Sequence, residues 1–272
     1  MSIITVSGQL GALRDELALA ISQRGRMECV DRHTLAESID GWVELSRDDH
    51  QLLAEQGPAM LGMSDRRRHI FAALLESVML QYARRGNVVL VGRGANQMLR
   101  LVPGVLRVRT VAPLELRAQR LAASEDLDLD TARQLATAVD QQRRAYVSHL
   151  LGGDWSSPLG YDLVLNTGRL SLEQAATTVL DLSAHEDFQV GDETERLVEE
   201  LVLASRVRLA MVQAVEVHAL EVEAEAGVVT LEGYLARQED LEAALRAAQE
   251  VEGVQKVQSH LEVSSTLSRL LY

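Results

Sequence analysis

The stretch "IITVSGQLGALRDELA", residues 3–18, combines a short apolar run, two glycines and the start of a helical pattern. Ile3–Val6 is typical of a buried strand, and the next apolar side chains recur at helical spacing, namely Leu13, Leu17, Ala20 and Ile21. A strand, a glycine-containing loop and a helix in this order present free backbone N–H groups where a phosphate binds. The stretch therefore predicts a phosphate-binding loop at the start of an α/β fold.

The alternation of apolar runs and helical patterns continues to residue 184. It predicts further strands at 27–30, 88–91, 105–112 and 161–167. Helices are expected at 65–85, from Pro113 and from Ser171, since proline and serine are favoured where a helix starts. Val88–Val91 is apolar throughout, as in a central strand that helices cover on both faces. Strands separated by helices indicate a parallel sheet with flanking helices.

A second, smaller domain is expected after the first, which spans 1–184. Residues 185–194 form a polar, acidic stretch that is typical of a linker. Residues 195–264 predict an α+β unit of order αββαβ: a helix at 196–215, two strands around a turn at Ala226–Gly227, a helix at 238–251 and a strand at 254–263. Residues 265–272 are expected to be a C-terminal tail.

Charge and composition exclude several classes of protein. The net charge is −13 and aromatic residues make up 3% of the chain, which argues against nucleic acid as a partner. The single cysteine, Cys29, rules out an internal disulfide, and the seven histidines show no metal-ligand spacing, so we expect no metal site. No signal peptide and no run long enough for a membrane span are recognised, so a cytoplasmic location is expected.

Several N-terminal motifs together carry a family resemblance. They are "VVLVGRGA" (88–95), "LRVRTVAPLELRAQRL" (106–121), "VDQQRRAYV" (139–147), "GDW" (153–155) and "YDLVLNTGRLSLEQA" (161–175). In order and spacing they resemble the cytidylate-kinase-like branch of the P-loop nucleoside monophosphate kinases, from Ile3 to about Leu182. The resemblance implies a P-loop kinase-like fold and transfer of a phosphoryl group from ATP, with Mg²⁺, to a nucleoside monophosphate. "Cytidylate" is a family label here, and the acceptor base stays open.

The resemblance also implies roles for individual residues. Arg93 would contact the acceptor nucleotide, and Gly8, Gly11 and Arg14 would belong to the loop that binds the donor phosphates. Arg117, Arg120 and Arg143 would close over the transferring phosphoryl group, and Asp140 would orient an arginine or bind the acceptor. The alternative interpretation is that Arg117, Arg120 and Arg143 are solvated residues on helix faces.

The loop itself departs from the family pattern of Gly-Ser-Gly-Gly followed by a basic or small polar residue. Leu13 and Asp15 place a bulky and a negative side chain where glycine and a cation are expected. The chain has one lysine, Lys256, so Arg14 is the nearby cation that could replace a loop lysine. The sequence therefore predicts a damaged loop and weak or lost activity. An active enzyme that binds phosphate through the N–H groups of Gly11–Arg14 stays an alternative.

The second region also carries a resemblance. The stretches "GVVTLEGYL" (227–235) and "VEGVQKVQSHLEV" (251–263), with Ala243 and Ala247 between them, are similar to a BON domain. The resemblance implies a domain that binds a small ligand or a protein, and the acidic composition argues against an anionic membrane as its partner. A noncatalytic alternative for the whole chain follows, in which a pseudokinase domain senses a nucleotide and the BON domain contacts a ligand or a protein.

Overall fold

The computed structural model describes residues 1–40 and 65–264. The chain divides into two compact units: residues 1–62 with 85–194, and residues 63–84 with 195–272. The expected tail at 265–272 lies outside the described residues.

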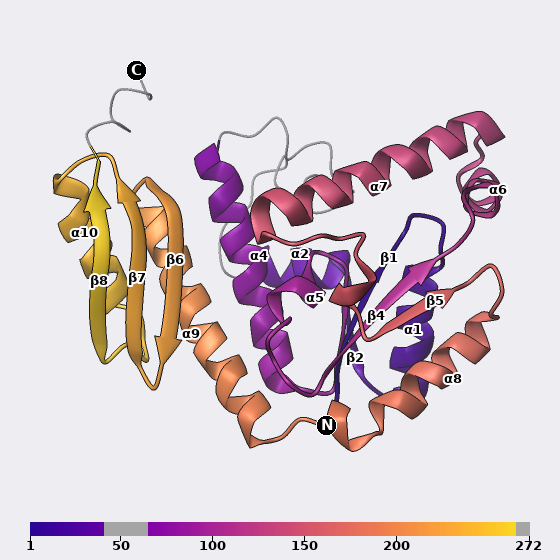
Figure 1. Ribbon diagram of the computed structural model, residues 1–272, viewed down its shortest axis with the longest axis horizontal. Helices are drawn as coiled ribbons and strands as arrows, with labels where there is room; N and C mark the ends of the chain where they lie inside the picture. Colours follow the sequence, from indigo (N-terminus) through magenta and orange to yellow (C-terminus); the bar gives the residue numbers. More distant parts are fainter. Residues whose placement is uncertain (41–64, 265–272) are drawn as a thin grey trace. The chain divides into compact units, whose positions relative to one another are not determined.

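The first unit is built on a five-stranded parallel sheet (Figure 1). Its strands are β1 (Ile3–Gly8), β2 (Glu28–Val30), β3 (Val88–Val91), β4 (Val105–Val111) and β5 (Leu163–Asn166). They lie in the order β2-β3-β1-β4-β5, and every neighbouring pair is parallel. The expected parallel sheet is confirmed, and because all strands point the same way, their carboxyl ends meet at one edge where ligands of such sheets bind.

Helices flank the sheet because successive residues of its strands point to opposite faces, and both faces carry apolar side chains. One face packs against α1 (Arg14–Gly25) and α8 (Leu172–Ser183), and this core includes Ile4, Val6, Leu17, Ile21, Leu106, Val108 and Val179. The other α-helices that the structure describes in this unit are α2 (Arg32–Asp40), α5 (Ala95–Met98), α6 (Leu114–Glu125) and α7 (Leu129–Leu151). Ser171 begins α8 with a capping box, as its position in the sequence indicates.

Helices α6 and α7 form a hairpin beside the carboxyl edge of the sheet. Ala118, Leu121, Ala132 and Ala136 are buried between them. The N-cap carboxylate of Asp128 accepts hydrogen bonds from the backbone N–H groups of Asp130 and Thr131, which fixes the start of α7. This hairpin positions the side chains of α6 and α7 that contact the loop after β1.

The second unit has the predicted αββαβ order. It contains α9 (Asp192–Ala214), β6 (Val217–Glu225), β7 (Val228–Leu235), α10 (Glu239–Gln249) and β8 (Lys256–Val263). β7 pairs with β6 antiparallel and with β8 parallel. Ala226 and Gly227 both have positive φ in the turn between β6 and β7, a backbone conformation that favours glycine.

Two features of the second unit are not visible in the sequence pattern. α4 (Asp65–Arg85), although it precedes β3, is grouped almost entirely with this unit, where Glu76 pairs with Arg208 and Arg84 with Glu199. α9 starts at Asp192, so the last residues of the expected linker are already helical. No helix within 1–40 or 65–264 is long and apolar enough to cross a membrane.

Candidate functional site: the loop after β1

The loop between β1 and α1 contains both glycines of the opening stretch, and packing requires both. A Cβ on Gly8 would lie 2.1 Å from Oγ1 of Thr110, and a Cβ on Gly11 would lie 2.8 Å from the carbonyl oxygen of Arg117. Gly11 also has a φ of +78°. The sequence therefore keeps glycine where the neighbouring strand and α6 approach the loop most closely.

Leu13 ends the loop in a conformation that is unusual for its side chain. Its φ of 57° lies in the left-handed region, and it is the residue that precedes α1. A non-glycine residue in this region costs about 1–2 kcal/mol. The expected helix thus starts at Arg14, and Leu13 occupies a position that glycine would adopt without strain.

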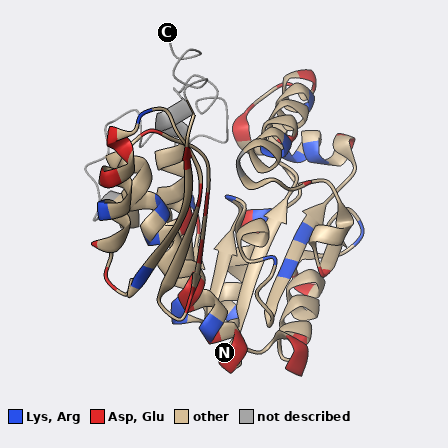
Figure 2. Cartoon of the chain, turned by 60° about the vertical axis from the view of Figure 1, so that its left-hand side comes forward, with Lys and Arg blue, Asp and Glu red and all other residues tan. Residues whose placement is uncertain are grey.

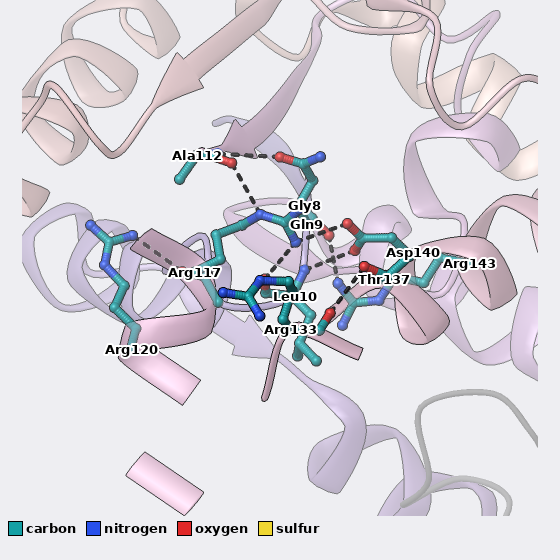
Figure 3. A network of polar contacts seen from close by, with 11 residues as sticks. Gly8, Gln9, Leu10, Ala112, Arg117, Arg120, Arg133, Thr137, Asp140 and Arg143 are labelled. Carbon is teal, nitrogen blue, oxygen red and sulfur yellow. Dashed lines mark hydrogen bonds and ion pairs between the residues drawn. The ribbon is translucent and has the colours of Figure 1, made fainter. Parts of the chain in front are cut away.

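The backbone N–H and C=O groups of Leu10 are both bonded to the members of one ion pair (Figure 3). Its N–H donates to Oδ1 of Asp140 at 3.0 Å, and its carbonyl oxygen accepts from Nη1 of Arg117 at 3.0 Å. Arg117 and Asp140 are themselves paired at 2.9 Å, and Nε of Arg117 donates to the carbonyl of Ala112. Arg117 is 5% exposed, so the interpretation of this residue as a solvated helix residue is wrong. In this structure Arg117 and Asp140 fix the loop.

Arg120 and Thr167 hold the next two carbonyl groups of the loop. Arg120 donates to the carbonyl of Gly11 at 3.1 Å and to the backbone and hydroxyl oxygens of Thr167. The Thr167 hydroxyl in turn donates to the carbonyl of Ala12 at 3.2 Å. Thr167 follows β5 and was expected from the sequence to end a strand. Its contact with the loop has no local signal because it depends on the sheet order, in which β4 lies between β1 and β5 and the carboxyl ends of all three meet at one edge.

Arg14 lies at the first position of α1 and is paired with its own neighbour. Its Nε and Nη2 atoms donate to the Asp15 carboxylate at 2.8–3.0 Å in a bidentate ion pair. Nη1 of Arg14 lies 3.0 Å from the point where a Cβ of Gly92 would be, so the guanidinium sits against the turn after β3. Asp15 therefore neutralises the cation that the sequence offers in place of a loop lysine.

Arg93 and Arg143 lie near Arg14. Arg143 donates from Nη1 to the carbonyl of Gly8 at 2.6 Å. Burial, and then the nearby Arg14 guanidinium, lower the pKa of Arg143 to about 9. Burial also lowers the pKa of Arg93, where Tyr146 opposes the change and Arg14 adds to it. The three expected residues are thus brought together, and their mutual repulsion makes the site favourable for an anion.

The loop retains part of the chemistry of phosphate binding. Within the described residues, no hydrogen bond uses the backbone N–H groups of Leu13, Arg14 or Asp15. These groups lie at the N-terminus of α1, where the helix dipole favours an anion. An anionic group can therefore bind there through the backbone.

The residues present do not fit a Mg²⁺ ion. The loop offers no serine or threonine at the start of α1, and the carboxylate of Asp15 is occupied by Arg14. Over the described part of the chain, no three His, Cys, Asp or Glu residues are grouped as metal ligands. The loop therefore lacks the oxygen ligands that Mg²⁺ prefers.

One further residue of this unit, Arg109, carries a buried charge outside the expected site residues. It is buried in β4 beside Trp155 and Tyr161. A signal was present, because a charged residue interrupts the apolar run "VLRVRTV" at 105–111.

Comparison with known proteins matches both units. Residues 3–169 match the profile of the cytidylate kinase-like family, and residues 200–265 match that of the BON domain. The chain is 28% identical to a cytidylate kinase of Pyrococcus horikoshii over 190 residues, which is 70% of this chain and 92% of that protein. It is 30% identical to a cytidylate kinase of Thermococcus sibiricus over 166 residues, or 61% of this chain and 79% of that protein.

A solved structure supports the fold assignment. The crystal structure of an uncharacterized protein from Eubacterium ventriosum aligns with a TM-score of 0.54 at 18% identity, covering 67% of this chain and 97% of that one. At this identity the likeness shows the fold alone. Together with the two profile matches, it confirms the predicted kinase-like parallel sheet followed by a BON domain.

Proposed function

Because the chain belongs to the cytidylate kinase-like family, we propose that its first unit binds a nucleoside monophosphate but transfers phosphate to it from ATP weakly or not at all. The observation that carries this proposal is the bidentate ion pair between Arg14 and Asp15. It neutralises the cation next to the loop, at the position where donor phosphates need positive charge.

The acceptor side supports binding. Arg93 and Arg143 lie at the carboxyl edge of the sheet, and burial and neighbouring cations lower the pKa of both. A phosphate that enters this cluster relieves the repulsion among the guanidinium groups. The relatives named cytidylate kinase make cytidine monophosphate the first nucleotide to test.

The donor side supports weak or lost transfer. Arg117 and Arg120 hold carbonyl groups of the loop, and no lysine lies in the first unit. Since the loop also lacks ligands for Mg²⁺, no transfer step is assigned to a metal ion. The backbone N–H groups at the start of α1 are the donors left for an ATP phosphate.

The proposal is tested with the full chain in two assays. Isothermal titration with cytidine, uridine, adenosine and guanosine monophosphates should show binding, which Arg143→Gln weakens about tenfold. Transfer of labelled γ-phosphate from Mg·ATP should be far below the 1 s⁻¹ that is usual for enzymes. Transfer at about 1 s⁻¹ or faster would refute the loss of activity, and absence of nucleotide binding would refute the proposal as a whole.

A matched pair of variants isolates the role of Asp15. Asp15→Asn releases Arg14 and should strengthen ATP binding about tenfold, because a charge at close range contributes more than 1 kcal/mol. Glu16→Gln removes the same charge from the next residue, which is exposed like Asp15 but makes no ion pair with Arg14 in the described part of the chain, and should change ATP binding little. Equal effects of the two variants would contradict a specific role for the ion pair. Adding Leu13→Gly to Asp15→Lys should strengthen ATP binding further if the loop alone is defective.

A second candidate function is regulatory. The match to a BON domain in the same chain favours a protein in which nucleotide occupancy affects contacts made by the second unit. In this case cytidine monophosphate should change hydrogen exchange in β6, β7 and β8 of the full chain. Exchange that changes only in the first unit would argue against this candidate. A cytoplasmic location stays part of the proposal.

A further inference from the structure

A pocket beside β4 and β5 is separate from the arginine cluster of the loop. Its volume is about 330 Å³, and its lining includes Arg109, Val111, Arg144, Trp155, Ser156 and Val164. Neither Arg14, Arg93 nor Arg143 belongs to the lining. The pocket touches the loop only through Gln9, and it touches α7 through Asp140 and Arg144.

Arg109 is the charged residue at the base of this pocket. It lies within the sheet, where it is the register partner of Ser7 on β1 and of Val164 on β5. Figure 2 shows basic residues within this sheet as blue segments. Its side chain stacks on Trp155, with 4.4 Å from the guanidinium carbon to the ring centre, and lies 5.2 Å from the ring centre of Tyr161. The residue is 5% exposed, which makes it one of the most buried charges described in the chain.

The hydrogen bonds of Arg109 are incomplete. One Nη1 hydrogen bond goes to the carbonyl of Trp155, whereas the buried Nε atom has no acceptor. In the described part of the chain no carboxylate lies within 4.0 Å of this guanidinium. Arg107 on the same strand pairs with Asp162, and the equally buried Arg117 pairs with Asp140. Arg109 thus differs from Arg107 and Arg117, each of which has a carboxylate partner.

A buried cation without an anion is costly. The free energy of removing a charge from water is recovered only by a partner of opposite charge or by several hydrogen bonds. Contact with two aromatic rings offsets a part of that cost, since cation–π contacts contribute about 0.5–2 kcal/mol. The remaining cost is offset if an anion occupies the adjoining pocket.

The other lining residues suit an anion that carries an apolar body. Arg144 adds a second guanidinium, which donates to the hydroxyl of Ser156. The carboxylate of Asp140 already accepts from Leu10 and Arg117, so it does not pair with either pocket arginine. Val111, Val164 and Trp155 supply apolar surface. We propose that this pocket binds a small organic anion, a carboxylate or a phosphate ester on an apolar or aromatic group.

Benzoate and phenyl phosphate are the probes for the two kinds of anion, and benzamide is the neutral control. The full chain carrying Trp42→Phe has Trp155 as its one tryptophan, so its fluorescence reports binding in the pocket. We expect saturable quenching by at least one of the two anions and at least about tenfold weaker binding of benzamide. Equal binding of benzamide, or no quenching by either anion, would overturn the proposal.

Variants at the exposed Val164 localise the probe without disturbing a buried group. Val164→Glu and Val164→Lys change the same exposed strand residue to opposite charges. Glutamate should weaken binding of the anion about tenfold, whereas lysine should preserve or strengthen it, provided both variants unfold at the wild-type temperature. Equal affinities of the two variants would overturn the assignment.

A second pair of variants tests the buried cation and separates this pocket from the nucleotide site. Arg109→Gln should abolish quenching, and if it does not fold, the comparison at Val164 still decides. Arg93→Gln should leave binding of the anion unchanged while it weakens binding of cytidine monophosphate. If Arg93→Gln loses binding of both the anionic probe and cytidine monophosphate, the probe binds in the arginine cluster. This result would overturn the proposal of a separate pocket.

Discussion

Replacement of Asp140 by alanine should destabilise the first unit through the buried partner that it leaves behind. The side chains of Arg117 and Asp140 are 6% and 12% exposed, so water screens their ion pair little. Removal of one partner from a buried pair costs about 3–5 kcal/mol, because the other charge stays buried. Arg117 keeps hydrogen bonds to two carbonyl groups, which places the expected loss near 3 kcal/mol.

The loss should appear as a shift in thermal unfolding of the full chain. For a unit of this size, each kcal/mol lowers the midpoint by about 2–4 °C, so Asp140→Ala should lower it by roughly 6–12 °C. Scanning calorimetry measures the midpoint, and in a Trp42→Phe background the fluorescence of the buried Trp155 assigns the shifted transition to the first unit. Asp140→Asn should cause a smaller decrease, since an amide oxygen still accepts one hydrogen bond.

An exposed ion pair on the same two helices supplies the control. Glu115 on α6 pairs with Arg133 on α7, and Glu115→Gln should leave the midpoint unchanged because water screens this pair. A decrease of less than about 1 kcal/mol for Asp140→Ala, or an equal decrease for Glu115→Gln, would refute the reasoning about the buried pair.

Three further predictions concern local packing and reactivity. Gly8→Ala should destabilise the first unit by about 1–3 kcal/mol because the added Cβ meets Thr110. Gly160→Ala should not destabilise it, because no atom lies within 4 Å of the added Cβ. Equal shifts in the unfolding temperature of the two variants would contradict this prediction. Ser171→Ala removes the cap of α8 and should cost about 1 kcal/mol in urea unfolding, and no change would contradict the capping box. Burial, and then Asp31, raise the pKa of the Cys29 thiol to about 11. Its reaction with a disulfide reagent should therefore be slow at pH 8 and faster toward pH 11, and it should become fast at pH 8 once urea unfolds the chain. Equal reaction rates in the folded and unfolded chain would contradict this prediction.

The strands of both units and several of their helices could be predicted from the sequence because their signals are local, whereas the sequence pattern gave no bounds for α2, α5 or α7. Val88–Val91 forms a buried strand over the predicted residues, and α4 spans the predicted residues 65–85. Ser171 starts a helix because a serine side chain can cap the backbone N–H groups next to it. Such signals depend on a few neighbouring residues, which the sequence displays directly.

The set of residues that come together in the candidate site could be predicted only in part. The sequence placed Gly8, Gly11 and Arg14 on one loop, and the resemblance placed Arg93 and Arg143 near a nucleotide. Neither the sequence nor the resemblance revealed that the Asp15 carboxylate pairs with Arg14 and so occupies the guanidinium that a ligand would need. The choice between a neighbouring carboxylate and a distant phosphate depends on side-chain geometry, which a motif does not contain.

The sequence by itself determined the order of the strands, the two-region organisation and the unusual composition of the loop. Only the tertiary structure decided that Arg117 and Asp140, 23 residues apart, hold the peptide of Leu10, and that Arg109 lies beside a pocket without a carboxylate partner. The physical reason is distance. Propensity and capping act between neighbouring residues, whereas the pairing or isolation of a buried charge is decided by which strands and helices the fold brings together.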